Sequence, residues 1–523
     1  MTNKADSGND SKRLVKNTLM LYARMLFSLL VSIYSSRVVL HALGATDYGI
    51  YNVVGGVVAM FSIISSSLSS ASSRFFTFEL GKGDDGRLAD TFSSSLKIQF
   101  ILAAVVFILA EVIGVWFLNN KMTIPTERMG AANVVLQCAL VSFITSMLIV
   151  PYNSAVIAHE KFDFYSITGI GEVFLKLAIA LFLAYAAFSG DKLIIYAFLL
   201  LCSTLAIQIA VLLFCRINFK ECRYRKIQDK SIAKEMVSFA GWQVFGSGVQ
   251  LLNGHGVNIV MNIFGGPVVN AARGLAVTVN NCIGRFVTNF SLALNPQITK
   301  AYASDDSDYM VSLVKRGARF SVYIFLLLAI PVFLEADFLI NLWLVEVPPH
   351  TVNFVKLVLL VSYSDILSAI LGMAINSTGK IRNYQIVVSA VLSLNFGFSY
   401  LVLKNGGTPE STYFLAIAAA FGALVVRLLF VKKQIGISIG DYIRTVYLNI
   451  FVVTAISLII PVFLVRIMES GWIRFICVVL VSVICTSLSV LFIGCDGGER
   501  RFILDYAIKF ISKFGINISN GKK

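Results

Sequence analysis

Long apolar runs separated by short polar breaks recur along the whole chain of 523 residues. Each run is near or above the ~20 residues that a helix needs to cross ~30 Å of hydrocarbon at ~1.5 Å per residue. Only 14% of the residues are charged and the mean hydropathy is +0.79, a composition that excludes a soluble globular domain or a disordered chain. We therefore expect an all-α polytopic membrane protein with about fourteen spans. The predicted spans are 14–43, 48–78, 96–118, 131–158, 164–188, 193–214, 236–264, 268–298, 320–345, 355–374, 386–403, 413–431, 442–465 and 473–493.

The basic residues predict the orientation. The chain holds 44 Lys and Arg against 29 Asp and Glu. With a cytoplasmic N-terminus, 30 of these 44 fall in cytoplasmic segments and only six in external loops. Because cytoplasmic loops attract Lys and Arg, we expect both termini in the cytoplasm of a bacterial inner membrane protein. Topology and anionic lipids explain the basic excess, so we expect no nucleic-acid partner.

The polar breaks of the first half of the chain recur in the second half. Gly83 is echoed by Ser304, and Glu160 by Gly379. The offset is about 220 residues, and six spans in each unit give two parallel repeats, which place a substrate site between two lobes. We predict an N-lobe at 1–218, a C-lobe at 219–440, two further spans at 441–498 and a cytoplasmic amphipathic tail at 499–523.

Eight basic residues remain once the cytoplasmic segments and the external loops have been assigned. For Arg74, Arg273, Lys356 and Arg427, near span ends, snorkelling to the interface is the preferred interpretation; Lys176 has Glu172 one turn before it. Arg24 and Arg285 lie deep in spans one and eight, where an arginine costs about 2.5–3.5 kcal/mol. Since no carboxylate lies within spans one, two, seven or eight, we interpret these two as lining a wet cavity that takes an anion. Arg37, about 140° from Arg24 around the helix, joins them only if the helix bends.

Polar side chains at helical spacing accompany these cations. Asn17 and Ser28 share a stripe with Arg24, Asn281 shares one with Arg285, and Gln250 and Asn258 follow span seven. We expect them to line the cavity, although small residues also permit close helix packing.

Two further residues are candidates for coupling to H⁺ or Na⁺. His255 and Asp365 lie within spans seven and ten, and a structural, hydrogen-bonded role is an equal or better interpretation of each. The eight cysteines are scattered without a metal-binding spacing, so we expect no metal site and no cofactor.

A family resemblance rests on the loop at 43–52, which reads Leu-Gly-Ala-Thr-Asp-Tyr-Gly-Ile-Tyr-Asn. It resembles the LGxxxYGxY-type loop of bacterial polysaccharide transporters, the O-antigen (Wzx-type) flippases. Their superfamily also holds the multidrug and toxin extrusion transporters. The resemblance implies a two-lobed carrier that moves undecaprenyl-diphosphate-linked oligosaccharides outward by alternating access. Glycan polymerase, export machinery and membrane lipids are the implied partners.

The resemblance also implies roles for the basic residues. Cations on helices one, two, seven and eight attract the diphosphate in that family, which corresponds here to Arg24 and Arg285, with Arg37, Arg74 and Arg273 as second choices. Two alternatives stay open: an antiporter of drugs or organic cations from the same superfamily, and a membrane glycan polymerase or acyltransferase. The external loops are short and show no nucleophile–base pattern, so we do not expect an enzyme.

Overall fold

The computed structural model describes residues 3–59, 62–120, 124–185, 190–227, 229, 231–251, 253, 256–344 and 347–513. These residues form helices joined by turns and loops, with no strand among them. They divide into two compact units. Unit 1 comprises 1–248, 292–310 and 376–386, and unit 2 comprises 249–291, 311–375 and 387–523.

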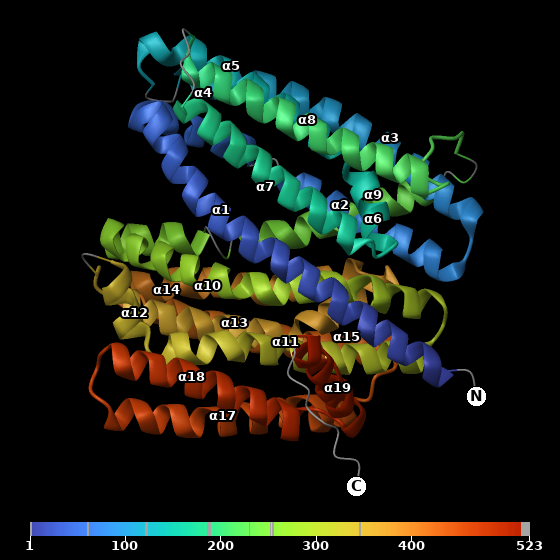
Figure 1. Cartoon of the computed structure of the whole chain (residues 1–523), viewed down its shortest axis with the longest axis vertical. Helices are drawn as coiled ribbons and strands as arrows, with labels where there is room; N and C mark the ends of the chain where they lie inside the picture. Colours follow the sequence, from blue (N-terminus) through green and yellow to red (C-terminus); the bar gives the residue numbers. More distant parts are fainter. Residues whose placement is uncertain are drawn as a thin grey trace. The chain divides into compact units, whose positions relative to one another are not determined.

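The helices of the first half of the chain build most of unit 1 (Figure 1). The pairs α1 with α7, α2 with α6 and α5 with α8 make its main helix contacts. The bounds are α1 Asn3–Ala59, α2 Ser62–Lys82, α3 Asp85–Leu109, α4 Val115–Asn120, α5 Met129–Leu148, α6 Val150–Ala158, α7 Phe162–Tyr185, α8 Lys192–Asn218 and α9 Ser231–Leu251.

The second half of the chain supplies the remaining helices, most of them in unit 2. Buried residues of α10, α11 and α13 form a continuous apolar core there, which includes Ala276, Phe325 and Phe354. The bounds are α10 Val257–Ala303, α11 Ser307–Leu334, α12 Ala336–Trp343, α13 Thr351–Thr378, α14 Arg382–Lys404, α15 Ser411–Ile435, α16 Ile439–Tyr442, α17 Leu448–Ile467, α18 Trp472–Ser489 and α19 Gly497–Lys513.

Ten helical segments in the described residues are long and apolar enough to cross a membrane. Each overlaps one of the fourteen predicted spans. The other four predicted spans fall on α1, α2, α9 and α10, the helices that carry the predicted polar stripes. The chain is therefore a multi-pass, all-α membrane protein.

Several boundaries differ from the prediction. Helix α10 (Val257–Ala303) runs unbroken through the break expected at 265–267, and predicted span nine, 320–345, is divided between α11, which ends at Leu334, and α12. The break expected after span one is a kink inside α1 at Gly44, whose φ of 80° and ψ of 167° suit a residue without a Cβ. Span four is interrupted where α5 ends at Leu148 and α6 begins at Val150, with Pro151 in the first turn of α6. Proline is accommodated there because the first turn of a helix needs no N–H donor.

The predicted repeat has a counterpart in loop geometry. Glu160 has a φ of 55° and donates its N–H to Ile157 O, at 2.9 Å. Gly379, its predicted equivalent, has a φ of 76° and donates to Asn376 O, at 3.1 Å. Likewise the Asp84 carboxylate accepts from Arg87 N and the Asp306 carboxylate from Tyr309 N, at 3.0 and 3.1 Å. These contacts begin equivalent helices in the same way.

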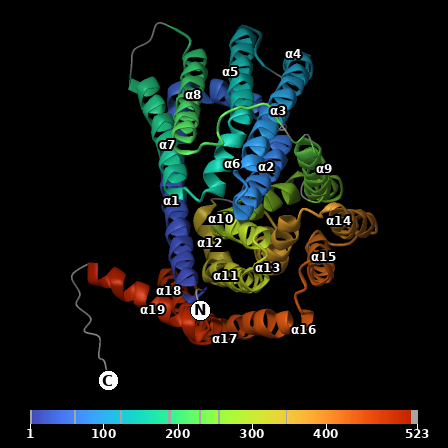
Figure 2. The same cartoon turned by 90° about the vertical axis from the view of Figure 1, so that its right-hand side faces the viewer.

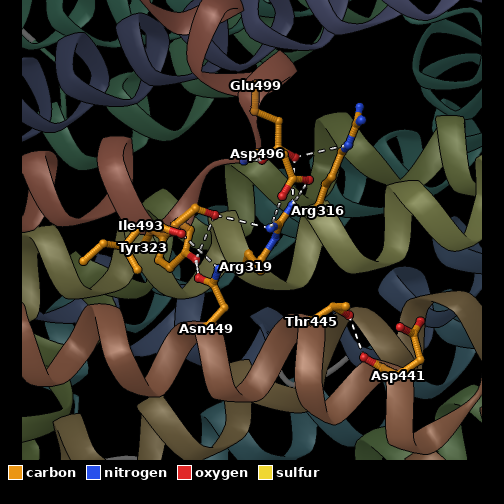
Figure 3. A network of polar contacts seen from close by, with 10 residues as sticks. Arg316, Arg319, Tyr323, Asp441, Thr445, Asn449, Ile493, Asp496 and Glu499 are labelled. Atoms are coloured by element: carbon orange, nitrogen blue, oxygen red, sulfur yellow. Dashed lines mark hydrogen bonds and ion pairs between the residues drawn. The ribbon is translucent and has the colours of Figure 1, made fainter.

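Helices α17 and α18 run side by side in unit 2 (Figures 1 and 2). A polar network joins this pair and α19 to α11 (Figure 3). Arg319, only 6% exposed, donates to Gly494 O at 3.3 Å and to Glu499 Oε1 at 2.9 Å, while Tyr323 and Asn449 bond to each other. The π-helical turn Val490–Gly494 follows α18 and presents the Gly494 carbonyl to Arg319.

Candidate functional site

Arg24 lies on α1 in unit 1 and is half-buried. Its guanidinium carbon is 4.4 Å from the ring centroid of Tyr165 on α7, a cation–π distance. Within the part of the chain that the structure describes, no carboxylate lies within ion-pair distance of Arg24. An aromatic face therefore supports this cation without neutralising it.

Gly169, one turn after Tyr165 on α7, completes this cradle. A Cβ built on Gly169 would lie 2.0 Å from Arg24 Nε and 2.3 Å from Cζ. Such distances are far below van der Waals contact, so the arginine side chain occupies the space that only a glycine leaves. Asn17, on the same helix as Arg24, is 5% exposed, and Ser28 is half-buried.

Arg285 lies on α10 in unit 2, and its side chain is exposed. Among the described residues it makes no hydrogen bond or ion pair. Asn281, one turn earlier, is also exposed, and Asn258 near the start of α10 is half-buried. The polar stripe predicted around Arg285 thus stands on the accessible surface of α10.

Arg74 differs from Arg24 because a backbone carbonyl accepts a hydrogen bond from it, in addition to its contacts with aromatic rings. It donates to Ser377 O at 3.2 Å, at the C-terminal end of α13, and its guanidinium lies 4.6 Å from Phe75 and 4.7 Å from Phe78 ring centroids. A cation at a helix C-terminus satisfies a free carbonyl and the helix dipole. This contact stands in place of the snorkelling predicted for Arg74.

A cavity of about 500 Å³ lies within unit 2. Arg273, Asp365 and Arg427 are its charged lining residues. Arg273 donates to Met261 Sδ at 3.0 Å, and its guanidinium carbon is 5.7 Å from the Tyr413 ring centroid. The uncharged polar lining residues are Asn253, Asn395, Thr412 and Tyr413.

Asp365 and Arg427 form an electrostatic pair across this cavity wall. Asp365 extends from α13 and Arg427 from α15, where Arg427 also donates to the Ser368 hydroxyl. The sequence predicts Arg427 near a span end, with its guanidinium at the interface. Helix α15 continues to Ile435, which sets Arg427 farther from the helix end. Three neighbours of Arg24 and Arg273 were also missed, because they come from other helices: Tyr165, Gly169 and Tyr413.

Three of the predicted site residues cannot be placed. His255 lies outside the described residues, and the side chains of Arg37 and Gln250 lie outside the described part of their helices. Arg24 and Asn17 belong to unit 1, whereas Arg285, Arg273 and Asp365 belong to unit 2. Their roles in binding or ion coupling stay predictions.

Solved structures similar to this chain are transporters of one fold. A MATE transporter in the bent conformation matches with a TM-score of 0.71 at 13% identity, covering 83% of this chain and 98% of its own. An outward-facing multidrug resistance MATE family transporter of the MOP superfamily matches at 0.68 and 14%, covering 82% and 96%. A MOP superfamily transporter from Pyrococcus furiosus, described as having a binding pocket of reversed polarity, matches at 0.66 and 14%, covering 82% and 96%.

The sequence comparisons are weaker. No family model matches the chain. The uncharacterized membrane protein EpsK of Bacillus subtilis (strain 168) is 22% identical over 130 residues, which is 25% of this chain. The chain matches only 26% of the length of that relative. None of these similar proteins is described as an enzyme, and the chain has the fold of a MATE-type membrane transporter.

Proposed function

We propose that this protein is a flippase that moves an undecaprenyl-diphosphate-linked oligosaccharide, a repeat unit of O-antigen, capsule or exopolysaccharide, across the bacterial inner membrane by alternating access. The observation that carries this proposal is the state of Arg24 and Arg285. Both are placed inside predicted membrane spans, and neither contacts a carboxylate in the described residues. An unneutralised arginine at that depth is costly, and a diphosphate supplies the missing counter-charge.

The transporter fold and the flat aromatic support of Arg24 agree with this substrate. A guanidinium held against a ring keeps its N–H edges available, and these edges match phosphate oxygens bidentately. The LGxxxYGxY-type loop adds the resemblance to polysaccharide flippases. In this proposal a glycan polymerase and export machinery act on the product after it reaches the outer leaflet.

The test is complementation in a strain that lacks its own flippase for a lipid-linked glycan. Arg24→Ala and Arg285→Ala should each reduce export at least tenfold at equal membrane abundance. Lys404→Ala is the matched control, because Lys404 is an exposed cation in the last turn of α14. Full export by both arginine variants would refute the proposal.

A second candidate function is the antiport of drugs or organic cations, since a solved structure of the same fold is a multidrug transporter. Asp365 is the observation that favours it, because it lines the cavity of unit 2. This function predicts drug resistance that is lost in Asp365→Asn and kept in Arg24→Ala. Export of lipid-linked glycan without any gain in drug resistance would exclude it.

A further inference from the structure

The cavity of unit 2 has a net positive lining. Its charged lining residues are two arginines, Arg273 and Arg427, and one aspartate, Asp365. The three side chains come from α10, α15 and α13. Asn253 and Asn395 lie together in the same lining, with Asn395 Nδ2 3.4 Å from Asn253 Oδ1, and add amide groups that can donate or accept.

The repeat shows which part of this arrangement the fold requires. One repeat earlier in the chain, Ser146 corresponds to Asp365 and Gln208 to Arg427, in the same register that pairs Glu160 with Gly379. In unit 1 Gln208 Nε2 donates to Ser146 Oγ at 2.9 Å, a contact that joins α5 to α8. A neutral contact thus joins α5 to α8 in unit 1, whereas the equivalent helices α13 and α15 carry charged side chains at these positions in unit 2.

The helix ends confirm that the two helix pairs correspond. Arg128 pairs with Asp191 just before α5 and α8, at 2.7 Å. His350 pairs with Glu410 just before α13 and α15, at 2.5 Å. His350 follows Arg128, and Glu410 follows Asp191, by nearly the same number of residues that separates the other equivalent positions of the repeat. The two helix pairs therefore correspond both at their ends and at the positions inside the helices. Because they correspond, the charges at 365 and 427 are a specific addition in unit 2.

Such an addition has an energetic cost without a benefit for packing. Burying an ion pair loses hydration that mutual attraction only partly restores, and a neutral pair of similar size often serves stability as well. The neutral pair in unit 1 shows that the equivalent helices α5 and α8 associate without charges at these positions. A second cation, Arg273, raises the cost further. We therefore infer that the charged side chains of this cavity serve to bind a ligand.

We propose that the cavity of unit 2 binds an oxyanion, a phosphate or carboxylate group, between Arg273 and Arg427, and that Asp365 is the internal counter-ion of Arg427 in the empty cavity. Guanidiniums bind both oxyanions through paired N–H groups. A volume of about 500 Å³ admits a phosphate or a single acidic sugar. The site belongs to unit 2 alone and is separate from Arg24.

The ligand has two possible sources, a free anion or the charged group of a lipid-linked glycan. Calorimetric titration of the detergent-purified protein with sodium phosphate, and separately with sodium glucuronate, measures binding of the free form. Sodium chloride at equal ionic strength is the blank. Export of lipid-linked glycan by the same variants measures the second source.

The decisive variant carries Asp365→Ser and Arg427→Gln together, which reproduces the neutral pair of unit 1. We expect its affinity for phosphate or glucuronate to fall at least tenfold. Asp365→Ser alone removes the competing carboxylate and should bind at least threefold more tightly. Arg24→Gln should bind as the wild type does, even if it exports nothing, which separates this proposal from the proposed function.

No saturable binding by the wild type, or unchanged affinity in the double variant, would overturn the proposal. If the double variant fails to accumulate, the gain expected for Asp365→Ser decides, and a loss of affinity there contradicts the role of Asp365. Lowered export by a stable double variant would assign the oxyanion to the glycan, and normal export to a free anion.

Discussion

The backbone of Gly169 on α7 lies directly against the guanidinium of Arg24 on α1. A Cβ at Gly169 would stand 2.0 Å from Arg24 Nε. This contact links the intramembrane cation of Arg24 on α1 to the absence of a side chain at Gly169 on α7. It makes the position of Arg24 testable without changing the arginine.

Gly169→Ala should displace the Arg24 guanidinium from the Tyr165 face and lower export about as much as Arg24→Ala does. Adding Gly169→Ala to Arg24→Ala should cause no further loss, because the two changes act through one contact. Export of lipid-linked glycan at matched protein levels measures both. Gly171→Ala is the control, since the nearest side-chain atom to its Cβ, Ile207 Cδ1, is 3.7 Å away. Equal export by the two alanine variants would refute the cradle.

The Tyr165 ring should be needed for its face and not for its hydroxyl. Tyr165→Phe keeps a cation–π surface for Arg24, so export should stay within about twofold of the wild type. Tyr165→Leu removes a contact worth about 0.5–2 kcal/mol and should lower export several-fold. The same transport assay checks the pair, and a Phe variant as impaired as the Leu variant would contradict this interpretation of the contact.

Much of the fold follows from the sequence because membrane spans are local properties. Span length and apolarity sum over ~20 neighbouring residues, so ten predicted spans overlap such helices. The kink at Gly44 and the break before Pro151 were harder to predict, since whether a glycine or proline ends a helix depends on the helices around it.

The site was less predictable, because its geometry is tertiary. A stripe on one helix identifies Arg24 but not Gly169, which lies on a different helix far along the chain. Arg427 was passed over because its distance from the end of an apolar run suggested snorkelling. A position-by-position comparison of the two repeats could have identified it. The neutral Gln208 of the first repeat corresponds to the charged Arg427 of the second.

Arg474, which lies on α18, should be essential for the stability of the α17–α18 pair. Its Nε lies 2.9 Å from Oε1 of Glu335, whose side chain is fully buried. Arg474→Ala leaves that carboxylate unpaired and should reduce the free energy of unfolding by about 3–5 kcal/mol. Adding Glu335→Gln should restore a large part of the loss. Thermal unfolding of the purified protein measures both, and a double variant no more stable than Arg474→Ala would contradict the pairing.

Asp191 should make stability depend on pH in the acidic range. Partial burial raises the pKa of Asp191, but the hydrogen bonds from Arg128 and from Leu193 N outweigh burial, so the pKa lies below its ordinary value of 3.8. The ionised carboxylate therefore stabilises the fold fully above pH 3.8, and this contribution is lost as the pH falls through the lowered pKa.

Asp191→Asn isolates this contribution, because asparagine caps the first turn of α8 as well as aspartate does. At pH 7 the variant should lose about 1 kcal/mol, or roughly 1–4 °C in the unfolding temperature. The difference from the wild type should shrink as the pH falls below 3.8. Thermal unfolding across a pH series measures it. A difference that stays constant down to the acid-unfolding limit would show that the Arg128–Asp191 ion pair contributes nothing, and that only the cap does.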